Sequence, residues 1–302
     1  MRRYAFFPGC MIPSRFPQFE ASSLKVLAEL GIRLERIDGW TCCPEPLSMQ
    51  TVSKETWYSV AARNISLAEE KGLDILTLCN GCNETLFEVN KELKANEKLR
   101  QEVNRNLKEI GRTFKGKISV KSILRVLYED IGLEAIKKHV KAPLKKSKIA
   151  LHYGCHIFPE LEDFDDLKNP QSFKELVNAL GGEVVTYPSE MTCCAAFARP
   201  ISEDVSLDFV REKLEDMSAA GAECIVVLCP YCFLQLDLGQ VILSRKLGRS
   251  FGIPVFYLSQ LLGLAMGFSP REMGLDFHTV KAHDFARKME PVRLQSENMS
   301  SD

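Results

Sequence analysis

The sequence predicts an α/β protein made of two similar Rossmann-like units, each a mainly parallel sheet flanked by helices. Three observations carry this prediction: the length and composition, a cysteine pattern that occurs twice, and short apolar runs that alternate with helical patterns. The chain has 302 residues, 45% hydrophobic and 26% charged, which suits two ordinary globular domains. Strands that alternate with helices favour a parallel sheet.

Ten of the eleven cysteines form the repeat. In the first copy a cysteine is followed after 31 residues by an adjacent pair, and after 35 more by a Cys-x2-Cys motif; the second copy has intervals of 37 and 34. The first set is Cys10, Cys42, Cys43, Cys79 and Cys82, and the second set is Cys155, Cys193, Cys194, Cys229 and Cys232. We therefore expect one domain over residues 1–147 and another over 148–302.

Within the first unit, the apolar run Ile75–Leu78 predicts a strand that leads into the Cys-x2-Cys motif. Asn90–Lys117 predicts a long amphipathic helix from its apolar spacing. Residues 133–147 are interpreted as a linker. The stretch 91–148 holds 17 Lys and Arg against 7 Asp and Glu, so it carries a charge of +10 and the remaining chain carries −11. A solvated helical face explains this charge, and docking of an anionic substrate or an acidic partner is the alternative.

In the second unit, Ile149–Tyr153 and Glu183–Tyr187 predict strands. Between them Phe173–Leu180 predicts a helix that ends at two glycines. The run Ile225–Leu228 matches the strand before the first Cys-x2-Cys motif. The polar residues 295–302 are expected to be disordered. Each cysteine motif then falls at or just beyond the carboxyl end of a strand, where open α/β sheets place their sites.

An odd number of cysteines in a chain without a signal sequence favours metal or redox chemistry over structural disulfides. Five thiolates in each copy exceed the four that zinc or a simple iron-sulfur cube accepts, so the count points to an unusual iron-sulfur cluster in each half. Two alternatives stay open: a structural zinc site in each half, and a redox thiol pair formed by Cys229 and Cys232. Cys224 lies outside the repeat and is interpreted as a small core residue.

This double pattern resembles that of the cysteine-rich CCG-domain family, in particular its heterodisulfide reductase B subunits of methanogens. The resemblance covers nearly the whole chain. Pro44 and Ala195 follow the two cysteine pairs where the family has a glycine, and the interval of 34 residues is one shorter than usual.

The resemblance implies one noncubane 4Fe-4S cluster for each set, two in all, with the five cysteines of the set as its ligands. It also implies reduction of the heterodisulfide of coenzyme M and coenzyme B to two thiols, with the disulfide cleaved between the clusters. The implied partners are the ferredoxin-like C subunit and the flavin-bearing, iron-sulfur-containing A subunit of heterodisulfide reductase, fed by a hydrogenase or a formate dehydrogenase. The alternative within the family is a protein serving lactate, glycerol phosphate or fumarate metabolism, and outside it a zinc-stabilised scaffold.

Product thiolates need protons, and histidine titrates near neutral pH. His152 and His156, which flank Cys155, are therefore candidate proton donors, with an ordinary hydrogen-bonded histidine as the alternative for each. Arg15 and Arg199 are candidates for anion binding, because each lies five residues after a cysteine motif.

Several absences limit the function. The sequence has no dinucleotide or phosphate-loop fingerprint and no ferredoxin motif, so electrons are expected from another chain. We expect no nucleic-acid partner, no membrane span and a cytoplasmic location, because no apolar run reaches about 20 residues and no secretion signal is evident.

Overall fold

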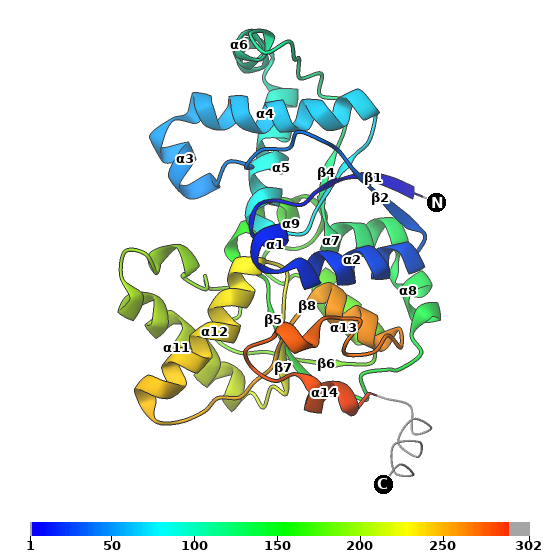
Figure 1. Cartoon of the computed structure of the whole chain (residues 1–302), viewed down its shortest axis with the longest axis vertical. Helices are drawn as coiled ribbons and strands as arrows, with labels where there is room; N and C mark the ends of the chain where they lie inside the picture. Colours follow the sequence, from blue (N-terminus) through cyan, green and yellow to red (C-terminus); the bar gives the residue numbers. More distant parts are fainter. Residues whose placement is uncertain (1, 290–302) are drawn as a thin grey trace.

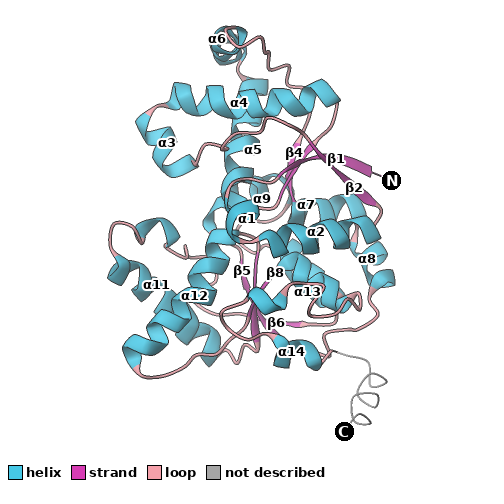
Figure 2. Cartoon of the chain, in the orientation of Figure 1, coloured by secondary structure: helices cyan, strands magenta, loops and turns pink. Residues whose placement is uncertain are grey.

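The computed structural model describes residues 2–289 and contains two parallel four-stranded sheets with the same strand order. The first sheet has the order β2-β1-β3-β4 and the second β6-β5-β7-β8. Every neighbouring pair of strands runs parallel. Helices flank both sheets, as Figure 2 shows by colour. The prediction of two similar α/β units with parallel sheets is confirmed.

The strands of the first sheet are β1 (Arg2–Phe7), β2 (Ile32–Arg36), β3 (Ile75–Thr77) and β4 (Val120–Ser122), and those of the second are β5 (Lys148–His152), β6 (Glu183–Val185), β7 (Cys224–Val227) and β8 (Val255–Tyr257). The helices of the first unit are α1 (Met11–Arg15), α2 (Pro17–Glu29), α3 (Pro46–Val52), α4 (Lys54–Lys71), α5 (Asn80–Ala95), α6 (Glu97–Lys108), α7 (Ile123–Arg125) and α8 (Leu133–His139). Those that follow are α9 (Phe158–Phe164), α10 (Ser172–Ala179), α11 (Glu203–Ala219), α12 (Pro230–Leu247), α13 (Leu258–Ala265) and α14 (His283–Arg287).

The two halves share one continuous hydrophobic core. In Figure 1 the first sheet lies in the upper half and the second in the lower half, with α2 and α13 side by side between them. Phe19 of α2 stacks on Tyr257 with ring centroids 4.8 Å apart and meets Phe233 of α12 edge-on at 4.7 Å. The buried hydroxyl of Ser23 donates a hydrogen bond to Ser259 across the same contact, at 2.9 Å. These contacts fix how the two units face each other.

The helical prediction for Asn90–Lys117 is wrong in its extent. Two helices occupy this stretch, α5 and α6, because Asn96 ends the first and caps the second by accepting a hydrogen bond from the Leu99 amide at 3.0 Å. After Lys108 the chain turns through Gly111 and Gly116, both with positive φ, which helices do not accommodate.

The linker predicted over 133–147 is also partly wrong, since it contains α8. Ile136 of this helix is fully buried, and α8 packs against α10. The predicted disorder at 295–302 lies outside the described residues. Within residues 2–289, no helix combines the length and the hydropathy that crossing a bilayer requires.

Candidate metal centre

The ten repeated cysteines line one cavity between the two halves. Parallel sheets bring the carboxyl ends of their strands to one edge, and this arrangement brings the cysteines of each set together. Cys10 and Cys155 come just after β1 and β5, while Cys79 and Cys229 are the residues that precede α5 and α12. The adjacent pairs lie in the loops that follow β2 and β6. The structure thus brings every predicted cysteine ligand to the same place.

Two glycines let the backbone approach the sulfur atoms. Gly9 and Gly154 precede the first cysteine of each set and have φ of +66° and +74°. A Cβ at Gly9 would lie 2.9 Å from the Cys82 Sγ, and one at Gly154 would lie 3.1 Å from the Cys232 Sγ. Both the positive φ and the missing side chain are therefore required at these positions. The repeat of this detail shows that the two sets have the same local construction.

In the second set neighbouring sulfur atoms lie within hydrogen-bond distance of each other. Cys155 and Cys193 are 3.6 Å apart, and Cys194 and Cys232 are 3.5 Å apart. Hydrogen bonds from neighbouring thiols lower the pKa of Cys193 far below its ordinary value and mainly account for the raised pKa of Cys155. The neighbouring thiols therefore favour the thiolate form of Cys193 over that of Cys155.

The same relation holds in the first set, where hydrogen bonds from Cys42 and Cys82 lower the pKa of Cys43 to about 5. The two sets meet at Cys79 and Cys229, where the Cys229 sulfur raises the pKa of Cys79 and the Cys79 sulfur lowers the pKa of Cys229. These residues hold corresponding positions in the repeat. The two sets of thiols therefore form one continuous group across the boundary between the halves.

The donor chemistry fits iron-sulfur groups. All eleven cysteines lie in the described part of the chain and are free thiols, and thiolates are the protein ligands that such groups use. The five cysteines of each set supply more sulfur than one zinc ion takes. The number of cysteines therefore suits an iron-sulfur group better than a single zinc ion.

Ala195 follows the second cysteine pair where the family has glycine, and its backbone keeps the conformation that favours glycine. Its φ and ψ are +54° and +28°. Its amide donates a hydrogen bond of 3.3 Å to the Cys193 Sγ, and its carbonyl accepts one of 2.9 Å from Ser206. Ala195 thus holds a left-handed conformation that glycine would adopt without strain.

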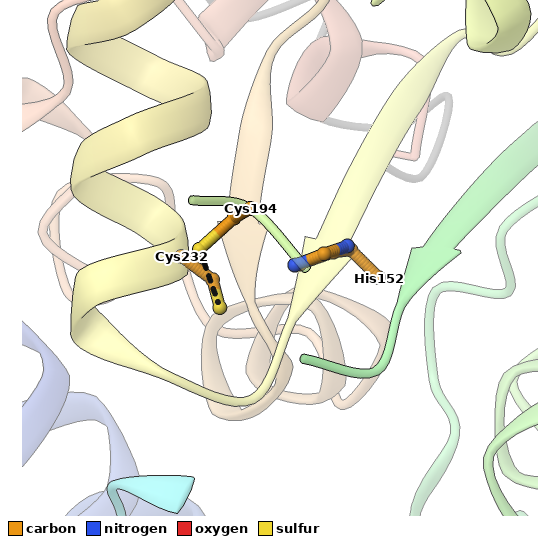
Figure 3. A group of neighbouring side chains, drawn as sticks. All are labelled: His152, Cys194 and Cys232. Carbon is orange, nitrogen blue, oxygen red and sulfur yellow. Dashed lines mark hydrogen bonds between the residues drawn. The ribbon is translucent and has the colours of Figure 1, made fainter. Parts of the chain in front are cut away.

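The two candidate histidines occupy different environments. His156 lines the cavity, and its Nδ1 is hydrogen-bonded to Glu84 of α5. His152 is fully buried at the end of β5, does not line the cavity, and has a pKa lowered to about 3, chiefly by burial. Its imidazole points toward Cys194 and Cys232, as Figure 3 shows. The structure therefore gives only His156 a position on the cavity wall.

Other sequence candidates lie away from the cavity. Neither Arg15 nor Arg199 lines it, and none of its lining residues falls in the basic stretch 91–148. In Figure 1 helix α6 of that stretch lies at the far upper end of the molecule. Cys224 is fully buried in β7, as expected for a core residue.

The sequence reasoning missed two residues near the sulfur atoms. Tyr231, inside the second Cys-x2-Cys motif, lines the cavity. Lys213 of α11 is fully buried close to the second set. The sequence held no signal for Lys213, because its correspondence with Asn64 of the first copy rests on the helix caps Ser53 and Ser202 in the structure.

Comparison with known proteins identifies the family that shares this sequence pattern and fold. The cysteine-rich domain model named CCG matches residues 4–87 and 149–237. The chain is 39% identical over 293 residues to the B subunit of the ferredoxin:CoB-CoM heterodisulfide reductase of Methanosarcina mazei, covering 96% of this chain and 97% of that protein. It is 33% identical to the 8-methylmenaquinol:fumarate reductase membrane anchor subunit of Wolinella succinogenes, over 93% of this chain and 98% of that one.

A solved structure of a hypothetical protein from Helicobacter pylori has the same fold, with a TM-score of 0.74 at 15% identity. The match covers 93% of this chain and 52% of the other, so the present chain corresponds to about half of that protein. The two matched segments of the CCG model contain the two sets of cysteines. The chain therefore belongs to the cysteine-rich CCG-domain family that includes the heterodisulfide reductase B subunits.

Proposed function

We propose that this protein is the catalytic subunit that reduces the heterodisulfide of coenzyme M and coenzyme B to the two thiols. The observation that carries the proposal is the single cavity lined by two equivalent sets of five thiols. A disulfide has two sulfur atoms, and a cavity with one thiolate set on each side offers each of them its own site. Relatives named as heterodisulfide reductase B subunits, at 39% and 40% identity, support the same reaction.

We further propose that each set holds one noncubane 4Fe-4S cluster. Cys10, Cys42, Cys43, Cys79 and Cys82 would hold the first, and Cys155, Cys193, Cys194, Cys229 and Cys232 the second. Such clusters supply one-electron redox chemistry next to the disulfide. The surrounding backbone holds the ligands: Gly9 and Gly154 allow the close approach, and the turn at Ala195 gives an amide hydrogen bond to the Cys193 sulfur.

The chain's own contribution also includes a proton. We propose that His156 donates protons to the product thiolates, since it lines the cavity and Glu84 holds its Nδ1. This arrangement leaves Nε2, which has no hydrogen-bond partner among the described residues, for proton transfer. His152 has no place on the cavity wall, so any proton from it would reach the substrate only through a ligand sulfur.

Electrons have to come from other proteins of a complex. The relatives are named as subunits of reductases. We propose a ferredoxin-like C subunit and a flavin-bearing A subunit as partners, with a hydrogenase or formate dehydrogenase as the source of their electrons.

We also propose a boundary between the two domains at 147/148 and a cytoplasmic location. The identity of 33% to a fumarate reductase subunit favours, as a second candidate, a role in fumarate metabolism.

The test is the rate at which the anaerobically purified complex oxidises reduced viologen. The coenzyme M and coenzyme B heterodisulfide, fumarate and simple disulfides are added in separate reactions. Rapid oxidation with the heterodisulfide alone supports the proposal. No oxidation with it, in a sample that retains its iron, contradicts the proposal, and oxidation with fumarate then supports the second candidate.

The variant His156→Gln tests the proton donor. Turnover is expected to fall about 100-fold, because positioned proton donors contribute on that order, while the iron content stays that of the unmodified protein. His283→Gln is the matched control, since His283 pairs with Asp276 at the surface, 2.9 Å away. Equal turnover in the two variants would reject the role of His156.

A further inference from the structure

The two cysteine sets have the same construction but different electrostatic surroundings. The sheet registers identify corresponding residues, since Phe7 at the end of β1 lies opposite Thr77 and His152 at the end of β5 lies opposite Val227. In the first half Phe7 packs edge-on against Trp40, with ring centroids 4.9 Å apart. In the second half the corresponding residue is an imidazole that carries an N–H group.

His152 has no hydrogen-bond partner of its own. Its side chain is fully buried, and neither ring nitrogen is paired among the described residues. One ring nitrogen and the sulfur atoms of Cys194 and Cys232 lie within 4.8 Å of one another, and Figure 3 shows the ring directed at these sulfurs from the end of β5. Buried N–H groups are usually paired, and the Cys194 and Cys232 sulfurs are the acceptors that the ring of His152 faces.

A second difference lies on the neighbouring helix. Ser53 and Ser202 cap α4 and α11 at corresponding positions, and eleven residues beyond each cap stand Asn64 and Lys213. Each contacts the threonine before the cysteine pair of its own half. Asn64 accepts a hydrogen bond from the Thr41 hydroxyl at 3.1 Å.

In the second half Lys213 donates to the hydroxyl of Thr192 at 2.7 Å and to the carbonyl of Ser189 at 2.5 Å. In the first half an uncharged amide occupies this position, and the half-buried guanidinium of Arg63 donates to its oxygen at 3.1 Å. In the second half a fully buried ammonium group takes its place. Both partners of the ammonium are uncharged, so hydrogen bonding alone does not balance its charge.

Lys213 is fully buried. Among the described residues no carboxylate lies within 4 Å of its ammonium group. Burial lowers its pKa, and the sulfur atoms of Cys194, Cys232 and Cys193 oppose that shift most strongly. A buried cation without a carboxylate partner is costly unless a nearby anion compensates it. The buried carboxylate of Glu190 interacts with this charge, since burial raises the pKa of Glu190 and Lys213 opposes that shift. The ligand sulfurs of the second cysteine set would provide further negative charge as thiolates when they hold the proposed iron-sulfur group.

We propose that Lys213 and His152 make the second cysteine set the stronger electron acceptor of the two, by giving the iron-sulfur group held there a higher reduction potential. A cation and an N–H donor next to thiolate ligands stabilise the more negative, reduced state, and both are levers that set such potentials. The step is a one-electron reduction with the electron from the proposed partner subunits, and no bond forms or breaks. The inference rests on the proposed function for its cofactor, and it goes further by giving the two halves different roles.

The test is an anaerobic potentiometric titration, with electron paramagnetic resonance as the readout and no substrate present. In the unmodified protein we expect two separate one-electron steps. Lys213→Gln and His152→Phe, the latter introducing the residue of the first half, should each lower the higher of the two potentials and leave the lower one unchanged. A tenfold change in the reduction equilibrium, about 59 mV for one electron, is the expected size for Lys213→Gln.

Two control variants separate these effects from general damage. Arg211→Gln removes a cation from the exposed part of the same helix, where it pairs with Asp208 at 3.1 Å, and should shift neither potential. His152→Gln keeps an N–H donor and should restore most of the potential that His152→Phe loses. Iron and sulfide content are measured for every variant, so that loss of the cofactor is seen directly.

Coincident potentials in the unmodified protein would overturn the inference whatever the variants do. It would also be overturned if Lys213→Gln and His152→Phe kept full iron and left both potentials in place. Absence of the heterodisulfide activity with two separate potentials intact would count against the proposed function and leave this inference standing. A protein that holds zinc and no iron would reject both.

Discussion

The substitution Gly154→Ala tests how tightly the second cysteine set is built. Gly154 has φ +74° and ψ +142°, a region that only glycine occupies readily, and a side chain there costs about 1–3 kcal/mol in backbone strain. The new Cβ would lie 3.1 Å from the Cys232 Sγ and 3.2 Å from the Asn80 Nδ2. Both neighbours are buried, so neither moves away freely.

The crowding adds a second cost. The same amide of Asn80 donates a hydrogen bond of 2.7 Å to the Tyr153 carbonyl and so joins the two halves. Weakening one such bond costs about 1 kcal/mol. The sum is about 2–4 kcal/mol, and the displaced Cys232 sulfur should reduce the iron held by the second set.

Gly72→Ala is the matched control, because Gly72 has φ +63° and a Cβ there meets nothing within 4 Å. It should cost only about 1 kcal/mol and keep all the iron. The assay is the thermal midpoint under anaerobic conditions, together with iron and sulfide per chain after reconstitution. If the two variants lose equal stability and both keep full iron, the close approach at Gly154 is not what requires a glycine.

Three further predictions concern the surroundings of the site. Ala195→Gly should raise stability by about 0.5–1 kcal/mol, because Ala195 has φ +54° and glycine adopts that conformation without strain; a lower thermal midpoint would contradict this. Burial raises the pKa of Glu160 from 4.5 to about 7, so the folded state holds its proton longer than the unfolded state. The free energy of unfolding should therefore fall by about 3 kcal/mol as pH rises from 4.5 through 7. Chemical denaturation at several pH values should show a weaker dependence of this free energy on pH for Glu160→Gln, and an equal dependence would refute the raised pKa of Glu160. Phe19→Ala removes the ring that stacks on Tyr257 between the halves and should cost about 3–5 kcal/mol, measured by chemical denaturation; a loss below 1 kcal/mol would show that this contact does not hold the halves together.

The sequence determined the repeat, and with it most of the fold and the site. Cysteine spacing and apolar runs identified which segments correspond, and parallel strands necessarily bring their carboxyl ends to one edge. The helix predicted over Asn90–Lys117 failed because one capping residue, Asn96, divides it. An apolar period describes which face of a helix is buried and carries little information on where the helix is interrupted.

Only the tertiary structure decided how the two halves meet and what surrounds each cysteine set. That both sets line one cavity depends on the packing of α2 against the second half, through Phe19 and its aromatic neighbours. The difference between His152 and His156 is one of burial, which four residues of sequence separation do not reveal. Lys213 lies on a different element from the cysteines whose sulfur atoms oppose the lowering of its pKa. Electrostatic environment depends on distances through space and on exclusion of water. The sequence therefore supplied the candidate ligands, and the packing of the two halves decided their surroundings.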